Sequence, residues 1–390
     1  MKASKLKYFF LFYFIYFISS GVFYPFVNVH YENLGFSGSE IGFINSTSLI
    51  FAMIITPLWG VWADKSQKYK TILALVMILA SLSGFVWSFQ TTLIRVVMLA
   101  TCITVFRSAI NPLADSLSVS YCANQSYDFG KIRGIGSLGY VMGSFVLANI
   151  ANHFGIQGPY MLMMCATLLI AAGISHFFPN IQTSNTLKID TKKLSIWESA
   201  KILSKNKRYV FIVILMLFTN LTMDSAGGYI GNHLINALEA EQSAIALYTL
   251  IAALPEVFFI MIVGNIVSRY GFKSMYLLAI ISQIIRLIGY SLVDSVPLFM
   301  FFTLPHMIMT GAGAVVNMNY IQKSVDPKIL TTAVSLYTGI YLVGQALYTQ
   351  IFGFIYQLWG SHTIFTVSAI LTSIGLVMVL MTKQLNFQRR

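Results

Sequence analysis

Six charged side chains and one histidine lie inside long apolar runs of this sequence. Placing an ionisable group in apolar surroundings costs several kcal/mol, so such groups usually face a cavity and pair with a partner. The seven residues are Arg95, Arg107, Asp115, Asp224, Glu256, Arg286 and His306. Arg95 stands at the start of its run, where its side chain can reach the interface, so we assign it no function. The other six form two groups, one in each half of the chain.

The group in the first half has the residue types that bind polar parts of a solute. Arg107, Asn111 and Asp115 follow one another at i+4 spacing, which makes one polar stripe on an otherwise apolar helix. We expect Asp115 to meet Arg133 of the next helix across a cavity and to bind substrate there, with Tyr140 as a stacking platform. In the simpler interpretation, Asp115 and Arg133 are a charge pair that locks two helix ends together.

The group in the second half has the residue types that carry protons. Asp224, Glu256, Arg286 and His306 fall near the middle of four different runs. Low dielectric favours the proton-bound carboxyl group, and a movable arginine nearby favours its release. We therefore predict that these residues couple proton movement. Each of them taken singly is equally well explained as a satisfied structural pair, and His306 alone as a hydrogen-bonded core histidine.

Composition indicates the elements that must position these groups. Of the 390 residues, 57% are hydrophobic and 10% are charged, whereas soluble domains carry roughly 25% charged residues. Long runs without strand-like alternation predict spanning helices rather than a barrel. The predicted fold is all-α, a polytopic membrane protein with twelve transmembrane helices in two pseudo-symmetric six-helix bundles. The expected helices cover residues 8–28, 41–63, 70–89, 93–121, 130–152, 158–178, 208–235, 243–268, 273–292, 297–321, 329–356 and 361–382.

The 25 lysine and arginine residues indicate the orientation of these helices. Apart from Arg95, Arg107 and Arg286, they lie at the two chain ends or on every second connection. The positive-inside bias then places both termini and the long connection in the cytoplasm of a multi-pass cell-membrane protein. The net charge of +12 thus indicates topology and anionic lipid headgroups, not a nucleic-acid surface.

A repeated loop supports the division into halves. The loops after the second and eighth helices share a glycine, a polar residue four positions later, a cation, and a further cation where the next helix starts. The residues are Gly60, Asp64 and Lys65 in the first copy and Gly264, Ser268 and Arg269 in the second. Glycine should let helix ends approach closely, and the charges should bridge neighbouring helices at the rim during conformational change. The rim ion pair should be weaker in the second copy, where serine replaces the acid.

The same division gives the expected domains. Residues 1–179 should form the first six-helix bundle, residues 180–207 a cytoplasmic linker rich in Lys, Ser and Thr, and residues 208–390 the second bundle.

Several other kinds of site are excluded. Three cysteines without paired spacing or a histidine partner exclude a disulfide scaffold and a metal site. The G-x-G-x-x-G at residues 134–139 follows no strand, so it predicts close helix packing rather than a dinucleotide site. No cofactor is expected. An intramembrane enzyme is disfavoured because the sequence has no H-E-x-x-H and no catalytic set at matching depth.

The chain resembles the branch of the major facilitator superfamily that contains lactose permease, nucleoside:proton symporters and phenylpropionate permeases. The block in the fourth and fifth helices is the most specific part of the resemblance, which spans nearly the whole chain. The matching segments are residues 21–26, 60–65, 112–115, 128–133, 136–140, 255–257, 304–306, 335–337 and 352–353, with Arg286.

The resemblance implies roles for five residues. Asp115 and Arg133 fall where lactose permease has its sugar-binding carboxylate–arginine pair, and Tyr140 falls at its stacking aromatic residue. Arg286 and His306 fall on its proton-coupling arginine and histidine.

The chain also departs from lactose permease. The permease's proton-carrying glutamate falls at Met309, and its glutamate on the eighth helix falls at Ala253. Glu256 falls at a position that contacts sugar in that permease. We therefore expect Glu256 or Asp224 to carry the proton.

The function expected from these observations is that of a monomeric, proton-coupled symporter that imports a small polar organic solute by alternating access. A sugar or glycoside is suggested by the acid, arginine and aromatic set, and an aromatic carboxylate by Arg107 together with Arg133; a nucleoside ranks third. The rival transport function is proton-coupled export of drugs or lipids, which the 30 Phe, 21 Tyr and 18 Met residues allow. A membrane scaffold or sensor built on an inactive transporter fold is a further alternative.

Overall fold

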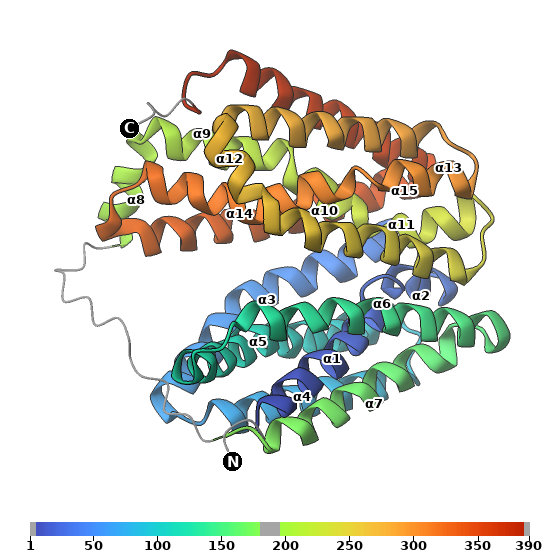
Figure 1. The fold of residues 1–390 in the computed structure, drawn as a ribbon. Coiled ribbons are helices and arrows are strands. Elements are labelled where there is room, and N and C mark those ends of the chain that lie inside the picture. The colour runs from blue at the N-terminus through green and yellow to red at the C-terminus, as the bar shows by residue number, and fades with distance from the viewer. Residues whose placement is uncertain (1–4, 180–195, 386–390) are drawn as a thin grey trace. The chain divides into compact units, whose positions relative to one another are not determined.

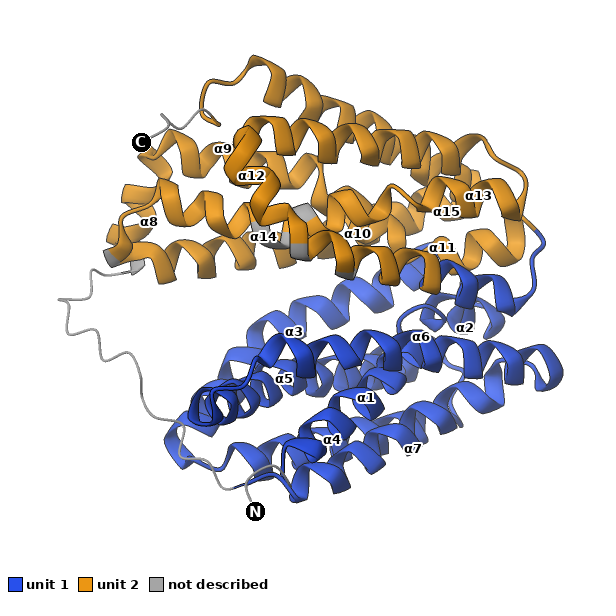
Figure 2. Cartoon of the chain, viewed as in Figure 1, with its two compact units in different colours: residues 1–188, 239–249 blue, residues 189–238, 250–390 orange. Residues whose placement is uncertain are grey.

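The computed structural model describes residues 5–179 and 196–385, and all regular structure in these residues is helical (Figure 1). By its internal contacts the chain divides into two compact units (Figure 2). Unit 1 comprises residues 1–188 and 239–249, and unit 2 comprises residues 189–238 and 250–390.

The helices of unit 1 follow one another along the first part of the chain. They are α1 (Leu6–Phe23), α2 (Val27–Asn33), α3 (Gly38–Ser66), α4 (Tyr69–Trp87), α5 (Leu93–Gln125), α6 (Phe129–Phe154) and α7 (Gln157–His176). Unit 2 has shorter pieces as well as two very long helices. Its elements are α8 (Ile196–Lys205), α9 (Lys207–Phe218), α10 (Asn220–Gly227), α11 (Ile230–Asn232), the π-helix η1 (His233–Ala237), α12 (Gln242–Leu292, whose first turns belong to unit 1), α13 (Val296–Thr303), α14 (His306–Ser324), the 3₁₀-helix η2 (Pro327–Ile329) and α15 (Leu330–Met381).

Eleven segments of the described chain are long and apolar enough to cross a membrane. One of these, Leu330–Met381, has 52 residues and is divided at Gly360, whose φ of +76° does not belong to a helix. Gly271 divides α12 in the same way with φ of +83°. Only glycine adopts this conformation without strain. With α15 counted as two spans, the twelve predicted membrane helices are confirmed.

Three predicted helices are broken where a single continuous helix was expected. The first is interrupted between α1 and α2 at Pro25, and the tenth between α13 and α14 at Pro305, because proline has no amide hydrogen for the helix ladder. The seventh, predicted as residues 208–235, is divided into α9, α10, α11 and η1. Its first break is at Thr219, with φ −118° and ψ −80°, where the hydroxyl donates to the Leu215 carbonyl oxygen at 2.8 Å.

The linker predicted at 180–207 also contains a helix. Residues 180–195, with the basic residues Lys188, Lys192 and Lys193, lie outside the described residues. The rest of the linker includes α8, a ten-residue amphipathic helix that buries Ser199 and Leu203 and exposes Trp197. The sequence prediction overlooked this helix because it was too short and too polar to resemble a membrane span.

Helices α1 and α6 pack with their backbones in close contact. An added Cβ atom would lie 1.8 Å from the Tyr140 carbonyl oxygen at Gly21, 2.2 Å from the Phe14 carbonyl oxygen at Gly139 and 2.2 Å from the Ile18 carbonyl oxygen at Gly143. No side chain larger than hydrogen fits at such distances. The prediction that the glycines of α6 serve close helix packing is confirmed for Gly136, Gly139 and Gly143, but not for Gly134, where an added Cβ would meet nothing within 4 Å.

Candidate functional site

The polar stripe of α5 is present, and Arg107 at its N-terminal end is the most deeply buried member. Arg107 is 2% exposed, and its Nη1 and Nη2 atoms donate to the hydroxyls of Ser19 at 3.0 Å and Ser20 at 3.1 Å. Its guanidinium also lies 4.9 Å from the ring centroid of Phe23 and 5.3 Å from that of Tyr24. Two hydroxyls and two aromatic rings at the end of α1 therefore contact this cation. In the described part of the chain its Nε atom has no hydrogen-bond partner and its charge has no acidic partner.

These contacts make Arg107 a bridge between α5 and α1. Arg107→Lys is expected to destabilise the protein by about 2 kcal/mol, because one ammonium group cannot reproduce the forked contact with two serines and leaves a buried hydroxyl without its donor. The measurement is the thermal unfolding midpoint of purified protein. Arg95→Lys, on the same helix, is the control, because Arg95 is exposed and donates to Gln90. An unchanged midpoint in Arg107→Lys would contradict the bridging role.

Asp115 and Arg133 both contact α1, one helical turn apart. The Tyr13 hydroxyl donates to Asp115 at 2.5 Å, and the Arg133 guanidinium lies 4.2 Å from the ring centroid of Phe17. Tyr13 and Phe17 stack on each other with centroids 6.3 Å apart. The predicted direct pair of Asp115 with Arg133 is not formed among the described contacts, since neither residue makes an ion pair there. Instead, the two charges are held at neighbouring positions along one face of α1.

The remaining members of this group take different positions. Asn111 is half-buried between Arg107 and Asp115, and its Oδ1 atom is buried without a hydrogen-bond partner among the described residues. Tyr140 lies on α6 with its backbone against Gly21 and its side chain half-buried. No ring contact of Tyr140 with a described residue supports or contradicts the stacking role, which stays a prediction.

In unit 2, three of the four predicted titratable residues come together. The Arg286 Nη1 atom donates to His306 Nδ1 at 2.5 Å, and His306 Nε2 lies 3.8 Å from Glu256 Oε2. Arg286 is fully buried and its Nε atom donates to the Tyr290 hydroxyl at 3.1 Å, which in turn contacts Thr303 at 2.9 Å. Residues from α12, α13 and α14 thus form one continuous polar chain, which we call the Glu256–His306–Arg286 chain.

The direction of the first contact assigns the histidine tautomer. An arginine can only donate, so His306 Nδ1 must accept and carries no proton. In the neutral imidazole the proton then sits on Nε2, the nitrogen that faces the Glu256 carboxylate. The distance of 3.8 Å between these atoms is too long for a hydrogen bond and leaves room for adjustment or for a water.

Asp224 does not join this chain by a direct contact. Its carboxylate accepts a hydrogen bond from the Tyr341 hydroxyl on α15, and its side chain is exposed. It lies on α10, which the break at Thr219 separates from α9. Three of the four residues therefore form the cluster predicted from the sequence, and Asp224 is not in direct contact with it.

The repeated rim loops behave differently from the expectation. A Cβ atom added at Gly60 or Gly264 would meet nothing within 4 Å, so the predicted close approach at these glycines is not found. Asp64 accepts a hydrogen bond from the Tyr69 hydroxyl at the start of α4. Lys65 is exposed, and the Arg269 guanidinium lies 5.4 Å from the ring centroid of Tyr270. Among the described residues, the hydrogen-bond partner of Asp64 is thus the hydroxyl of Tyr69 and not a cation.

The second cation of each rim loop has an equivalent role in its own unit. Lys70 Nζ donates to the carbonyl oxygen of Phe178, just after the end of α7, at 3.2 Å. Lys273 Nζ donates to the carbonyl oxygens of Leu380 at 3.1 Å and Thr382 at 3.3 Å, at the end of α15. A cation stabilises the carbonyl groups that a helix leaves unpaired at its C-terminus. Each loop therefore fastens the last helix of its unit, which supports the interpretation of the loops as a repeat.

Sequence reasoning overlooked the aromatic hydroxyls that hold these charges. Tyr13, Tyr290 and Tyr341 each contact one predicted site residue. In the first span, Tyr13, Tyr16 and Ser20 recur every three or four residues among apolar neighbours, a polar stripe that could have identified α1 as the partner of α5.

Comparison with known proteins gives a consistent result over nearly the full length. Residues 6–367 match the model of the MFS_1 like family. The maltose permease of Geobacillus stearothermophilus is 26% identical over 387 residues, which are 98% of this chain and 96% of that protein. The probable 3-phenylpropionic acid transporter of Escherichia coli (strain K12) is 23% identical over 369 residues, 92% of this chain and 93% of that protein. The crystal structure of the nucleoside transporter NupG has the same fold, with a TM-score of 0.81 and 19% identity over 96% of this chain and 99% of that one.

Proposed function

This chain belongs to the MFS_1 like family of major facilitator transporters, and from that premise we propose that it is a proton-coupled symporter that imports a sugar or glycoside. Membership in a family of multi-pass transporters confirms the family resemblance, the membrane fold and the expectation that the chain is not an enzyme. The nature of the solute, the coupling to protons and the direction of transport are the proposed part.

The observation that carries the sugar proposal is the arrangement of Asp115 (α5) and Arg133 (α6) against α1. Asp115 can accept hydrogen bonds from sugar hydroxyls and Arg133 can donate them. The half-buried ring of Phe17, which stacks on the buried Tyr13, offers an apolar face to the C–H side of a pyranose. Both charged side chains are half-buried, so neither is closed off from a ligand. The similarity to a maltose permease over nearly the whole chain supports the same class of solute.

Replacing either charge tests this site. Asp115→Asn and Arg133→Ala are each expected to weaken sugar binding by at least about tenfold, since a hydrogen bond to a charged group is worth about 1.5–3 kcal/mol. Binding is measured by the thermal shift of purified protein titrated with maltose and related glycosides. Asp294→Asn is the control, because Asp294 is exposed and contacts only His362 among the described pairs. Wild-type affinity in both Asp115→Asn and Arg133→Ala would remove these residues from the site.

An aromatic carboxylate is the second candidate solute. It is favoured by the similarity to a probable 3-phenylpropionic acid transporter and by two arginines, Arg107 and Arg133, beside a single acid. Arg107 is already engaged by two serines, which ranks this candidate below a sugar. In the same titration, a shift with 3-phenylpropionate and none with glycosides would reverse the order. A nucleoside ranks third.

For proton coupling we propose that Glu256 takes up and releases the proton. When Glu256 is ionised, its charge and that of Arg286 balance across the neutral His306 ring; protonation of Glu256 leaves Arg286 without that balance. This change in charge favours a different conformation of the Glu256–His306–Arg286 chain. A conformational change of the protein links proton binding to solute binding. Asp224 is the alternative proton carrier; it accepts a hydrogen bond from Tyr341 and does not contact the Glu256–His306–Arg286 chain directly.

We further propose a cell-membrane location with both termini in the cytoplasm and a monomeric protein. The alternation of basic connections along the sequence supports this orientation.

The two six-helix bundles at residues 1–179 and 208–390 remain part of the proposal. The internal contacts differ from these bounds in one respect, since they assign residues 239–249 to unit 1. Acidification of the cytoplasm on addition of solute to cells would support import by symport; the absence of acidification would contradict it.

A further inference from the structure

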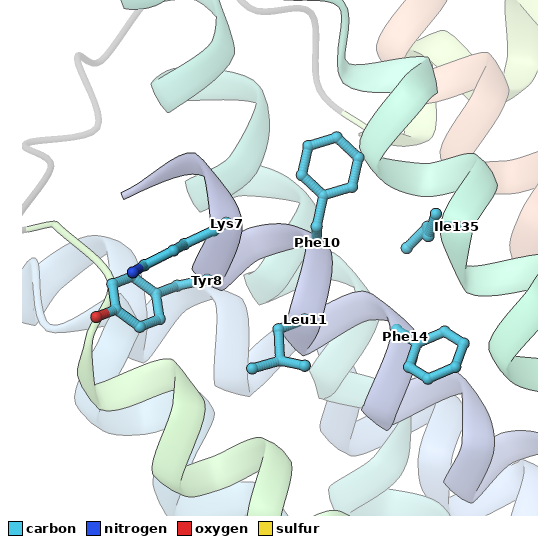
Figure 3. A pocket seen from close by; sticks show the side chains of 6 residues that line it. All are labelled: Lys7, Tyr8, Phe10, Leu11, Phe14 and Ile135. Carbon is cyan, nitrogen blue, oxygen red and sulfur yellow. The ribbon is translucent and has the colours of Figure 1, made fainter. Parts of the chain in front are cut away.

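A pocket of about 620 Å³ lies on unit 1 beside the N-terminal half of α1 (Figure 3). None of its lining residues belongs to the polar stripe of α5 or to the Glu256–His306–Arg286 chain. Figure 3 shows that its lining comes from α1 on one side and from α6 on the other. The lining residues are Lys7, Tyr8, Phe10, Leu11, Phe14 and Ile135.

The pocket lies beside the close contact of α1 and α6. The helices touch backbone to backbone at Gly143 and Gly139, and at Gly136 an added Cβ would still lie 2.7 Å from the Phe17 ring. Phe14 of α1 and Ile135 of α6 line the pocket next to this contact.

The pocket has an apolar interior and a basic rim. Phe10, Leu11, Phe14 and Ile135 offer no hydrogen-bonding group, whereas a site for a polar solute needs several that converge. Lys7 at the rim is exposed, with Nζ 5.3 Å from the ring centroid of Tyr8. No acidic residue of the described chain lines the pocket.

A second cation stands close to the same rim. The ring of Tyr127 packs edge-on against Phe10 with centroids 6.2 Å apart, and Lys131 Nζ lies 5.8 Å from the Tyr127 ring centroid. Lysine and tyrosine at the end of a membrane span lie at headgroup depth. The rim is therefore suited to a phosphate and the interior to a hydrocarbon chain.

We propose that this pocket binds one anionic phospholipid, with an acyl chain against its apolar lining and the phosphate at Lys7. Charge complementarity selects the anionic lipid over a zwitterionic one, since each lysine near a lipid surface attracts anionic headgroups. A lipid in this position would cover the apolar lining and stabilise unit 1, and no lining residue belongs to the proposed sugar site.

Native mass spectrometry of the purified full chain tests the proposal with phosphatidylglycerol and phosphatidylcholine of identical acyl chains. The wild-type protein is expected to retain phosphatidylglycerol preferentially and to gain a higher thermal unfolding midpoint from it. Lys7→Gln should weaken phosphatidylglycerol retention about fivefold, the loss expected for one lysine at an anionic surface. Lys68→Gln, an exposed lysine of the α3–α4 connection, should match the wild type.

A pocket-filling variant tests the acyl-chain part. Leu11→Trp should reduce retention of phosphatidylglycerol, whereas Leu82→Trp, an exposed leucine on α4, should not. Equal retention of the two lipids by the wild type, or unchanged retention in Lys7→Gln, would overturn the proposal. Lys7 is exposed, so this variant is decisive even if Leu11→Trp does not fold. Lipid retention is read without transport, so its failure would leave the proposed symport untouched.

Discussion

Glu256→Gln is expected to abolish uphill accumulation of solute while solute exchange continues. Glutamine keeps the size and polarity of the side chain but cannot be ionised, so the charge balance with Arg286 across His306 no longer changes. A potential of about 100 mV supplies about 2.3 kcal/mol for each proton, enough for roughly 50-fold accumulation of a neutral solute. We expect this ratio to fall to about 1 in the variant.

The measurement uses proteoliposomes with an imposed potential and pH gradient, and counterflow of labelled solute reports exchange. Asp294→Asn is a matched control, because Asp294 also contacts a histidine, His362, at 3.8 Å but stands outside the Glu256–His306–Arg286 chain. Asp224→Asn is measured in parallel. Full accumulation by Glu256→Gln together with its loss in Asp224→Asn would transfer the coupling role to Asp224.

The second large effect is expected at the contact between α1 and α6. Gly139→Val should prevent unit 1 from folding, because its Cβ alone would lie 2.2 Å from the Phe14 carbonyl oxygen and the valine methyl groups need still more room. Backbone cannot move aside as a flexible side chain can, so the destabilisation should exceed the roughly 1–3 kcal/mol typical of overpacking. Fluorescence-detected size-exclusion chromatography of the detergent-extracted protein measures the yield of folded monomer.

Gly134→Val is the matched control on the same helix. A Cβ there would meet nothing within 4 Å, and valine is tolerated in a membrane helix, so the yield should stay near that of the wild type. Normal yield of Gly139→Val would show that the two helices do not hold this contact in the folded protein. The prediction concerns folding alone and is independent of the solute.

The candidate site was predicted unevenly from the sequence. The charged residues themselves could be found, because an ion in an apolar run stands out by composition alone; Arg286, His306 and Glu256 do come together. Their partners could not be found so simply. Asp115 was expected to pair with Arg133 and instead accepts a hydrogen bond from Tyr13. The rotation of each helix about its axis decides which of several nearby polar groups a carboxylate reaches.

The breaks in the helices show the same limit. Proline residues were visible in the sequence, yet a proline kinks some helices and ends others: α3 and α5 continue through Pro57 and Pro112, whereas Pro305 separates α13 from α14. Neighbouring helices and side chains decide between these outcomes because they can satisfy the freed carbonyl groups. The divisions near residues 271 and 360 were predicted from the sequence, and the backbone angles of Gly271 and Gly360 show the residue at which each helix is divided.

Composition, the length of the apolar runs and the alternation of basic connections were enough to determine an all-helical membrane chain with twelve spans, because burial in lipid constrains each segment on its own. Tertiary structure alone decided that Arg107 binds two serines, that tyrosines hold the acids, and that α1 and α6 meet backbone to backbone at Gly21, Gly139 and Gly143. The physical reason is that the energy of a spanning helix depends on its own residues, whereas the partner of a buried charge depends on angles and separations between helices.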